Sequence, residues 1–267
     1  MVLLSVSLCA QSVFEFKTKE IEPVTLMATY SMRYTEDSLN TDFLPQEDML
    51  LLIGKNTSCF MSYNYYLFVN SLKKITTDIA YKEWLMNPDL RPPVTRFTYR
   101  IIKANDQGKI TFYGRVMPDF FTYDEPREIF KWTLCSDTIS INGYLCQKAK
   151  TKFGGRTWIA WFSTALPYPD GPYKFSGLPG LIVKLNDTQN HYTFEMLSIA
   201  KPSEMMMIEI GDENYISTTK KEFFKAEDAY HDDIINRAKE AGLSSDSQQT
   251  AARNMAKRNN PIELERK

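Results

Sequence analysis

Histidine is scarce in this chain of 267 residues, which contains only His191 and His231. Neither has a cysteine or a second histidine at the spacing of zinc ligands, so the sequence predicts no metal site and no cofactor. No G-x-S-x-G motif occurs, and the nearest candidate serine, Ser176, has a glycine on one side only. Phosphate loops, G-x-G-x-x-G turns and EF-hand loops are also absent. The familiar metal, triad, nucleotide and calcium chemistries are therefore not expected.

The chain also lacks an excess of either charge. Lys and Arg number 32 against 33 Asp and Glu, which gives a net charge of -1. Because a global basic field is missing, we expect no nucleic-acid partner. Beyond residue 10 no segment approaches the ~20 apolar residues of a membrane-spanning helix, so we expect a chain that does not span the membrane. Aromatic residues are plentiful, at 13%, which favours β-rich packing or a surface that holds an apolar group.

The first ten residues have the pattern of a targeting signal. Val2 to Ala10 form a short apolar run that ends in small residues and is followed by Gln11. This pattern is typical of the apolar region and cleavage site of a signal peptide whose basic start is missing. We therefore expect residues 1–10 to be a truncated signal peptide, and the mature chain to be exported to the periplasm or cell envelope. The alternative is the first β-strand of a cytosolic protein.

Three cysteines remain after such a cleavage, namely Cys59, Cys135 and Cys146. An odd number leaves at least one thiol unpaired in a monomer. Cys135 and Cys146 flank Ser136 to Gly143, which we interpret as a hairpin connection, so they would face each other across two strands. An exported chain permits a disulfide between them. The alternative is that all three are buried thiols that pack as small apolar side chains.

Alternating apolar residues predict about ten strands. The alternation runs from Val24 to Tyr34, and it recurs on both sides of a turn at Asn105 to Gly108, which is the clearest hairpin. Thr157 to Phe162 is apolar on both faces, as expected of a central strand. Short turns join nearly all of these strands, so we expect consecutive strands to pair antiparallel in one large curved sheet.

Helical spacing appears in two regions. Apolar positions between Ser71 and Met86 predict one helix that covers the sheet. Thr219 to Glu222 has the spacing of a capping box and predicts a helix that ends at Gly242. A second capping box at the start of Ser245 to Arg258 predicts a weaker helix, which is expected to fray or to dock only on a partner. The ending Pro261 to Leu264 is predicted to be an exposed apolar-acidic tail.

Together these elements predict an α+β fold that is mainly β. We expect a large curved antiparallel sheet, similar to a half-barrel, with a covering helix and a C-terminal helical tail. Residues 11–215 are expected to form the antiparallel β domain, and residues 216–267 the helical tail packed on or beside it. The chain is long enough to bury a substantial core.

Proline and glycine gather in one stretch, Pro169 to Ile182, which also carries aromatic and aliphatic side chains. Each proline fixes its own φ, and each glycine reaches positive φ without steric cost. The segment is too apolar for an ordinary solvated linker. We therefore expect an ordered loop that serves either as a structural cover or as a binding element.

The same stretch resembles a known protein family. Gly155 to Phe162, then Gly171 to Phe175, and then the hexapeptide Gly177 to Ile182 are similar to the signature of the GLPGLI family of secreted Bacteroidetes proteins. Asn259 to Leu264 also resembles that family's usual terminus. The resemblance covers nearly the whole mature chain and implies export. It implies no activity, because the family is defined by sequence and offers no catalytic residues.

The candidate binding residues lie in and beside this loop. Arg156 starts the predicted central strand, and Asp170 and Asp187 are carboxylates that it could clamp. One interpretation is that such an ion pair locks the loop to the sheet; the other is that the charged groups line the mouth of a groove. The full set of candidates is Arg156, Trp158, Trp161, Asp170, Tyr173, Lys174, Phe175, Leu178 and Asp187.

Three functional hypotheses follow, in this order. The first is a non-enzymatic exported envelope protein that binds an apolar small molecule, lipid, peptide or partner segment on its curved sheet and GLPGLI loop, and it predicts a sizeable apolar cavity beneath the loop. The second is an assembly factor of an envelope protein complex, with the loop and the C-terminal tail as interaction surfaces. The third is a hydrolase with acidic residues around Asp170 and Asp187.

Overall fold

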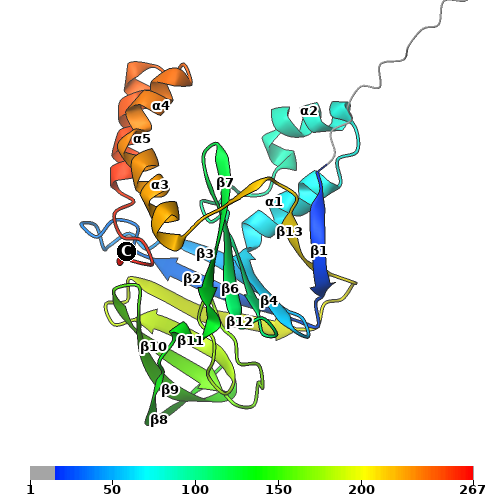
Figure 1. Cartoon of the computed structure of the whole chain (residues 1–267), viewed down its shortest axis with the longest axis vertical. Helices are drawn as coiled ribbons and strands as arrows, with labels where there is room; N and C mark the ends of the chain where they lie inside the picture. The colour runs from blue at the N-terminus through cyan, green and yellow to red at the C-terminus, as the bar shows by residue number, and fades with distance from the viewer. Residues whose placement is uncertain (1–15, 267) are drawn as a thin grey trace, which may run out of the picture.

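A sheet of twelve strands dominates the computed structural model, which describes residues 16–266 (Figure 1). The predicted signal peptide, residues 1–10, lies outside the described residues. In spatial order the strands are β14 (Tyr215–Ser217), β7 (Asp119–Pro126), β6 (Lys109–Val116), β5 (Arg100–Ala104), β4 (Thr57–Ser62), β3 (Gln46–Ile53), β2 (Leu26–Tyr34), β12 (Tyr192–Ala200), β11 (Leu181–Asp187), β10 (Arg156–Ser163), β9 (Tyr144–Phe153) and β8 (Thr133–Ile141). The predicted class, α+β and mainly β, is confirmed.

Two antiparallel meanders make up this sheet. The first runs from β2 to β7 and the second from β8 to β12, with each strand beside its neighbour in sequence. They join where β2 pairs with β12, with Tyr34 opposite Tyr192. Only β14 pairs parallel to its neighbour, β7, within the described part of the sheet. A separate ribbon pairs β1 (Thr18–Pro23) with β13 (Met207–Gly211). The fourteen described strands outnumber the roughly ten that were predicted, because β1, β7 and β14 gave no clear alternation.

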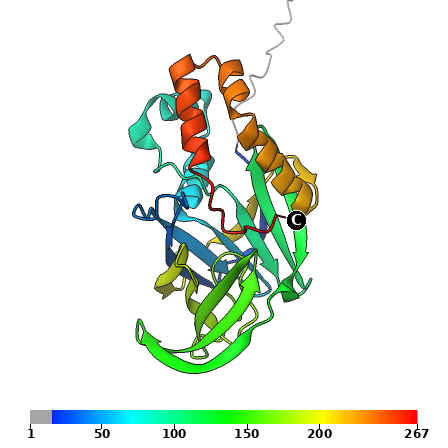
Figure 2. The same cartoon turned by 90° about the vertical axis from the view of Figure 1, so that its left-hand side faces the viewer.

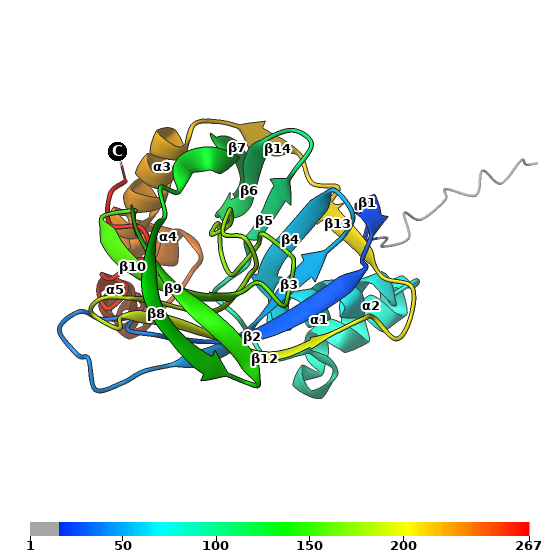
Figure 3. The same cartoon turned by 90° about the horizontal axis from the view of Figure 1, so that it is seen from below.

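The sheet is curved and open, since its edge strands β14 and β8 do not pair with each other. Seen from below, it curls around the segment that joins β10 to β11, residues 164–180 (Figure 3). The main apolar core therefore lies on the inner face, and Phe175 and Leu178 from this segment belong to it. Strands β3 and β4 are buried on both faces, because a second apolar cluster that includes Leu50 and Ile208 covers their outer side.

The helix predicted over Ser71 to Met86 is wrong, because two helices occupy this region. They are α1 (Tyr63–Lys73) and α2 (Asp78–Met86), followed by the 3-10 turn η1 (Pro88–Leu90). The Ser62 hydroxyl accepts a hydrogen bond from the Tyr65 amide at 3.1 Å and starts α1 directly after β4. The Thr77 hydroxyl starts α2 in the same way. Two side-chain caps override the apolar spacing that suggested one helix.

Three helices follow the strands near the chain's end. They are α3 (Lys220–Asp232), α4 (Ile234–Glu240) and α5 (Ser245–Ala256), and the predicted single helix up to Gly242 is broken at Asp233. The Thr219 cap is confirmed, since its hydroxyl accepts from the Glu222 amide at 3.2 Å. Helix α3 packs against β6 and β7, and Phe223 is its buried contact with the main core. The proposed boundary between residues 215 and 216 stays a prediction.

The chain does not end in an exposed tail, and that prediction is wrong. After α5 it turns back across the sheet toward α3, as the red segment in Figure 2 shows. Residues 259–265, called the C-terminal segment below, include Asn260 and Glu263, whose side chains are buried. The Leu264 amide donates to the Gly154 carbonyl at 2.7 Å. The polar side chains of Asn260 and Glu263 are buried because partners distant in the sequence, described below, form hydrogen bonds with them.

The disulfide between Cys135 and Cys146 is not formed, because the hairpin differs from the prediction. Strand β8 continues to Ile141, and the connection is a two-residue turn of Asn142 and Gly143 with φ values of 50° and 81°. This register places Ile139 opposite Cys146. All three described cysteines are free thiols. The 3-10 turn η2 (Arg127–Ile129), which lies between β7 and β8, connects the two meanders.

Candidate functional site

The segment that joins β10 to β11, residues 164–180, contains most of the predicted loop and is called the GLPGLI loop below. It lies inside the curve of the sheet rather than on its surface (Figure 3). Tyr173 takes a positive φ of 55°, and a Cβ at Gly180 would stand 2.1 Å from the Ser163 carbonyl oxygen. Only glycine permits that approach. The Phe175 ring lies 4.8 Å from the Trp158 ring, and both side chains are fully buried. The loop is therefore a structural filling of the curve, one of the two roles predicted for it.

Asp170 anchors the start of this loop to β4 and β5. It forms an ion pair with Lys103, whose side chain is fully buried, and accepts a hydrogen bond from the Ser58 hydroxyl at 2.5 Å. The Lys103 ammonium also donates to the Gly171 carbonyl at 2.6 Å. Burial lowers the pKa of Lys103, and Asp170 opposes that shift. Asp170 thus pairs with Lys103 and not with Arg156.

Lys174 links the middle of the loop to the C-terminal segment. Its ammonium lies 2.6 Å from a Glu263 oxygen, 2.5 Å from Glu125 and 3.0 Å from the Tyr123 hydroxyl. The Tyr173 hydroxyl donates to Glu263 at 2.7 Å. Burial alone would raise the pKa of Glu263, but Lys174 and a second lysine, Lys220, outweigh it and hold that pKa below its ordinary value. The network is internal and charge-paired.

Arg156 makes the third buried link. Its guanidinium donates to Asp187 at 2.9 Å and to the Asn260 side-chain oxygen at 2.6 Å. It also donates to the carbonyls of Pro261 and Ile262, at 2.7 and 3.1 Å. Of the two interpretations of Arg156, the structure therefore matches the ion pair that locks segments together. The partner is Asp187, and the locked segment is the C-terminal one.

The remaining candidates do not line a groove mouth. Trp158, Phe175 and Leu178 are core residues. Trp161 is half-buried on the opposite face of β10, where the Lys148 ammonium lies 5.5 Å from its ring. Asp170 and Asp187 each have their own cationic partner, so they form no pair of free carboxylates. The hydrolase hypothesis gains no support from them.

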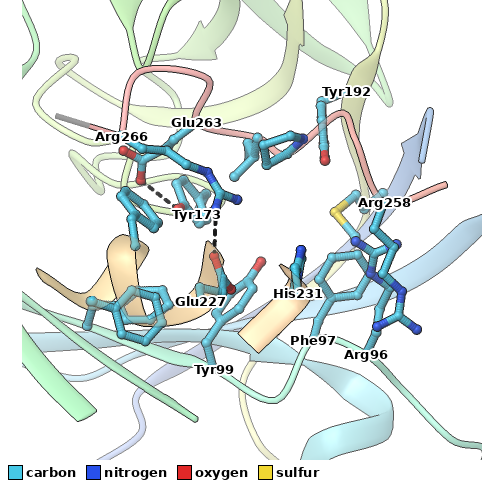
Figure 4. Close-up of a pocket in the computed structure, with 16 residues that line it drawn as sticks. Arg96, Phe97, Tyr99, Tyr173, Tyr192, Glu227, His231, Arg258, Glu263 and Arg266 are labelled. Atoms are coloured by element: carbon cyan, nitrogen blue, oxygen red, sulfur yellow. Dashed lines mark hydrogen bonds and ion pairs between the residues drawn. The ribbon is translucent and has the colours of Figure 1, made fainter. Parts of the chain in front are cut away.

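A cavity of about 180 Å³ lies between the inner face of the sheet, α3 and the C-terminal segment (Figure 4). Tyr173 is the member of the candidate set that reaches it. Aromatic and aliphatic side chains form most of its wall. The lining residues are Met32, Arg96, Phe97, Tyr99, Phe112, Tyr173, Tyr192, Phe223, Phe224, Glu227, His231, Arg258, Pro261, Ile262, Glu263 and Arg266.

Polar groups converge in this cavity from α3 and from the segment before β5. Figure 4 shows Glu227, His231 and Tyr99 pointing into it from the same side. Glu227 and His231 are four residues apart, so they share one face of the helix. Within residues 16–266 neither the Tyr99 hydroxyl nor the His231 ring hydrogen-bonds to another residue, and both side chains are half-buried and reach the cavity. Burial raises the pKa of Tyr99, so its hydroxyl stays protonated and can donate.

His231 also predicts how stability depends on pH. Burial first, and then Arg266 and Arg258, lower its pKa from the ordinary value of 6.5. A depressed folded-state pKa means that the unfolded chain binds the proton more tightly, so stability is full above pH 6.5 and falls on acidification through the folded pKa. Urea unfolding at about pH 8 and about pH 5.5 should show a smaller loss in His231→Gln than in the wild type. Equal losses in both chains would contradict this assignment.

Sequence reasoning missed the residues that line the cavity. Tyr99, Glu227 and Arg258 come from three distant parts of the chain, and His231 was considered only as a metal ligand and rejected as one. The Glu227 and His231 spacing on an expected helix was the one available signal. No group of three or more His, Cys, Asp or Glu in the described part of the chain could hold a metal ion.

The fold described above is similar in part to that of solved structures. The chain is similar to PNGF-II in two crystal forms, P21 and C2, with a TM-score of 0.52 for each and identities of 12% and 13%. The similarity covers 76% of this chain but only 33% and 32% of the PNGF-II chains, so this chain spans about a third of their length. At this identity the likeness shows the fold alone. No protein-family model and no curated protein matches the chain.

Proposed function

We propose that the mature chain is a non-enzymatic binding protein of the cell envelope. Its ligand is a small amphipathic molecule held in the cavity between the sheet, α3 and the C-terminal segment. The observation that carries the proposal is the combination of an aromatic wall with polar side chains that face the cavity, above all Tyr99 and His231. A few polar groups among apolar walls are typical of small-molecule sites, where the polar groups orient the ligand.

Export and membership of the GLPGLI family are part of this proposal. They rest on the apolar run Val2 to Ala10 and on the hexapeptide Gly177 to Ile182. No helix in residues 16–266 is both long and apolar enough to cross a membrane. An envelope location is consistent with a carrier or receptor of small molecules.

The position of the loop changes where the ligand would bind. The first hypothesis placed it on the concave face beneath the GLPGLI loop, but the loop's own Phe175 and Leu178 occupy that space. Tyr173 alone among the candidate residues connects the loop to the cavity. The volume of about 180 Å³ favours a compact ligand over a two-chain lipid.

The two other hypotheses receive less support. An assembly factor that uses the loop and the tail as interaction surfaces needs those residues to be accessible, but Lys174 and Glu263 are buried against each other. A hydrolase needs free acidic groups, whereas Asp170 and Asp187 are both ion-paired.

Native mass spectrometry of the chain isolated from its natural host tests the proposed function. The mature wild type should carry a bound mass that leaves on denaturation. Ile262→Trp, which fills the cavity with a larger side chain, should lose most of that mass. Ile235→Trp is the matched control, because Ile235 is half-exposed on α4 and does not line the cavity. A wild type of bare monomer mass would contradict the proposal.

A further inference from the structure

Charge is distributed unevenly around the cavity. At one end the guanidiniums of Arg96 and Arg258 both contact a single carboxylate, Glu36, the Arg258 contact being 3.4 Å. At the other end Arg266 contacts two carboxylates, Glu227 at 3.2 Å and Asp228 at 2.5 Å. The Arg96 and Arg258 end therefore has a surplus positive charge, and the Arg266 end does not.

His231 lies where this positive charge acts on the cavity. Its pKa is lowered first by burial and then by Arg266, Arg258 and, more weakly, Arg96, while Asp228 opposes the shift. Arg266 is balanced by Glu227 and Asp228, so the net positive charge near the imidazole ring comes from Arg96 and Arg258, which share one carboxylate. This charge favours an anion on the Arg258 side of the ring. The charged groups near His231 are Glu227 and Asp228 on α3, Arg96 before β5, and Arg258 and Arg266 after α5.

Hydrogen-bond donors without acceptors point to the same kind of ligand. The Tyr99 hydroxyl stays protonated and has no partner in the described residues. A neutral His231 ring carries one N–H, and it too has no partner there. In Figure 4 His231 stands between Glu227 and Arg258, and Tyr99 points into the cavity from the same side as His231. What this end lacks is a negatively charged acceptor.

The rest of the wall favours an apolar group. Phe97, Phe223 and Ile262 offer no hydrogen bonds from their side chains, so a second anion or the hydroxyls of a sugar would be buried there without partners. A ligand that matches both parts has a compact apolar body and one charged oxygen group.

We infer that the cavity binds a small organic acid, with its carboxylate held by Arg258, His231 and Tyr99 and its apolar body against the aromatic wall. This inference rests on the proposed function and names the ligand class of the same site. The carboxylate would neutralise the surplus charge shared by Arg96 and Arg258 and would accept the two unpartnered donors.

A matched pair of probes tests this assignment. We would measure the binding of 3-phenylpropionate and of 3-phenylpropan-1-ol to the mature chain by calorimetry. The acid should bind about tenfold more tightly or better, because hydrogen bonds to a charged group exceed neutral ones by that order. Arg258→Gln should weaken binding of the acid and leave the alcohol unchanged. Arg253→Gln is the control, since Arg253 lies on α5, donates a hydrogen bond to the nearby Thr250 hydroxyl and does not line the cavity.

A second readout distinguishes binding in the cavity from binding elsewhere. The NMR titration of the His231 ring should show a higher pKa with the acid bound than without it, because the carboxylate stabilises the charged imidazolium. The alcohol should not raise the pKa, and the His191 resonance should respond less to either probe. The variant His231→Gln assigns the two signals.

The outcomes distinguish the carboxylate assignment from the proposed function of ligand binding in the cavity. Equal affinities for acid and alcohol in the wild type, with cavity binding lost in Ile262→Trp, would overturn the carboxylate assignment and leave the proposed function standing. Binding of neither probe, together with a bare monomer mass, would overturn both. Tight binding of the acid that survives in Ile262→Trp with an unchanged His231 titration would place it outside the cavity and also overturn the assignment.

Discussion

Removal of Asn259 to Lys267 is expected to destabilise the fold strongly. The shortened chain loses Glu263, which pairs with Lys174 and Lys220, and Asn260, which accepts a hydrogen bond from Arg156. Lys174 and Lys220 are then left to share Glu125, whereas Arg156 keeps Asp187. Removing one partner of a buried charge pair costs about 3–5 kcal/mol. The free energy of unfolding of a domain is only about 5–15 kcal/mol, so the loss is a large fraction of it.

Circular dichroism and urea unfolding of the shortened chain would measure this effect. A chain that ends at Glu265 is the matched control, because it keeps Asn260 and Glu263 and should fold. If the chain that lacks residues 259–267 instead unfolds cooperatively at the wild-type urea concentration, the segment is peripheral. The assembly-factor hypothesis would then regain an accessible tail.

Lys174→Ala is expected to reduce the free energy of unfolding by about 3–5 kcal/mol. The ammonium is fully buried and serves both Glu125 and Glu263, so its removal leaves two carboxylates to share Lys220. Urea unfolding should show the loss as a lower midpoint. Lys184→Ala is the control, because the partly exposed Lys184 meets Glu195 at 3.4 Å, and such surface pairs contribute about 1 kcal/mol or less.

A double variant checks that the loss comes from the unpaired charge. Lys174→Met combined with Glu263→Gln removes both charges, and it should be less destabilised than the sum of its single changes. An additive result would mean that the two side chains act independently. A loss in Lys174→Ala as small as that in Lys184→Ala would show that the network contributes little.

The strands were predictable from the sequence because their signal is local. The alternation from Val24 to Tyr34 gives β2, in which buried and more exposed side chains alternate along nearly the whole strand. The turn at Asn105 to Gly108 likewise gives the hairpin of β5 and β6. Where a local cap competed with an apolar pattern, as at Ser62, the prediction of the helix was wrong.

The C-terminal segment and the cavity were not predictable because their causes are distant in sequence. Nothing beside Glu263 indicates burial, and its partners Tyr173 and Lys174 lie about 90 residues earlier in the chain. Arg156 was correctly suspected of an ion pair, but a strand pattern does not tell which carboxylate lies within reach. The pairing became clear only when the register placed Trp158 opposite Asp187.

The pairing of β2 with β12 has a consequence for the order in which the chain acquires its structure. One edge of β2 pairs with β3, but its other edge has no partner until β12, near residue 192, is synthesised. The Thr35 carbonyl accepts a hydrogen bond from Asn260, which lies 225 residues further on. Contacts of such separation form late and slowly. A chain emerging from the ribosome therefore exposes the inner face of its first meander until almost the last residue is available. Under the export proposed above, that delay would keep the chain in the unfolded form that translocation through a membrane channel requires.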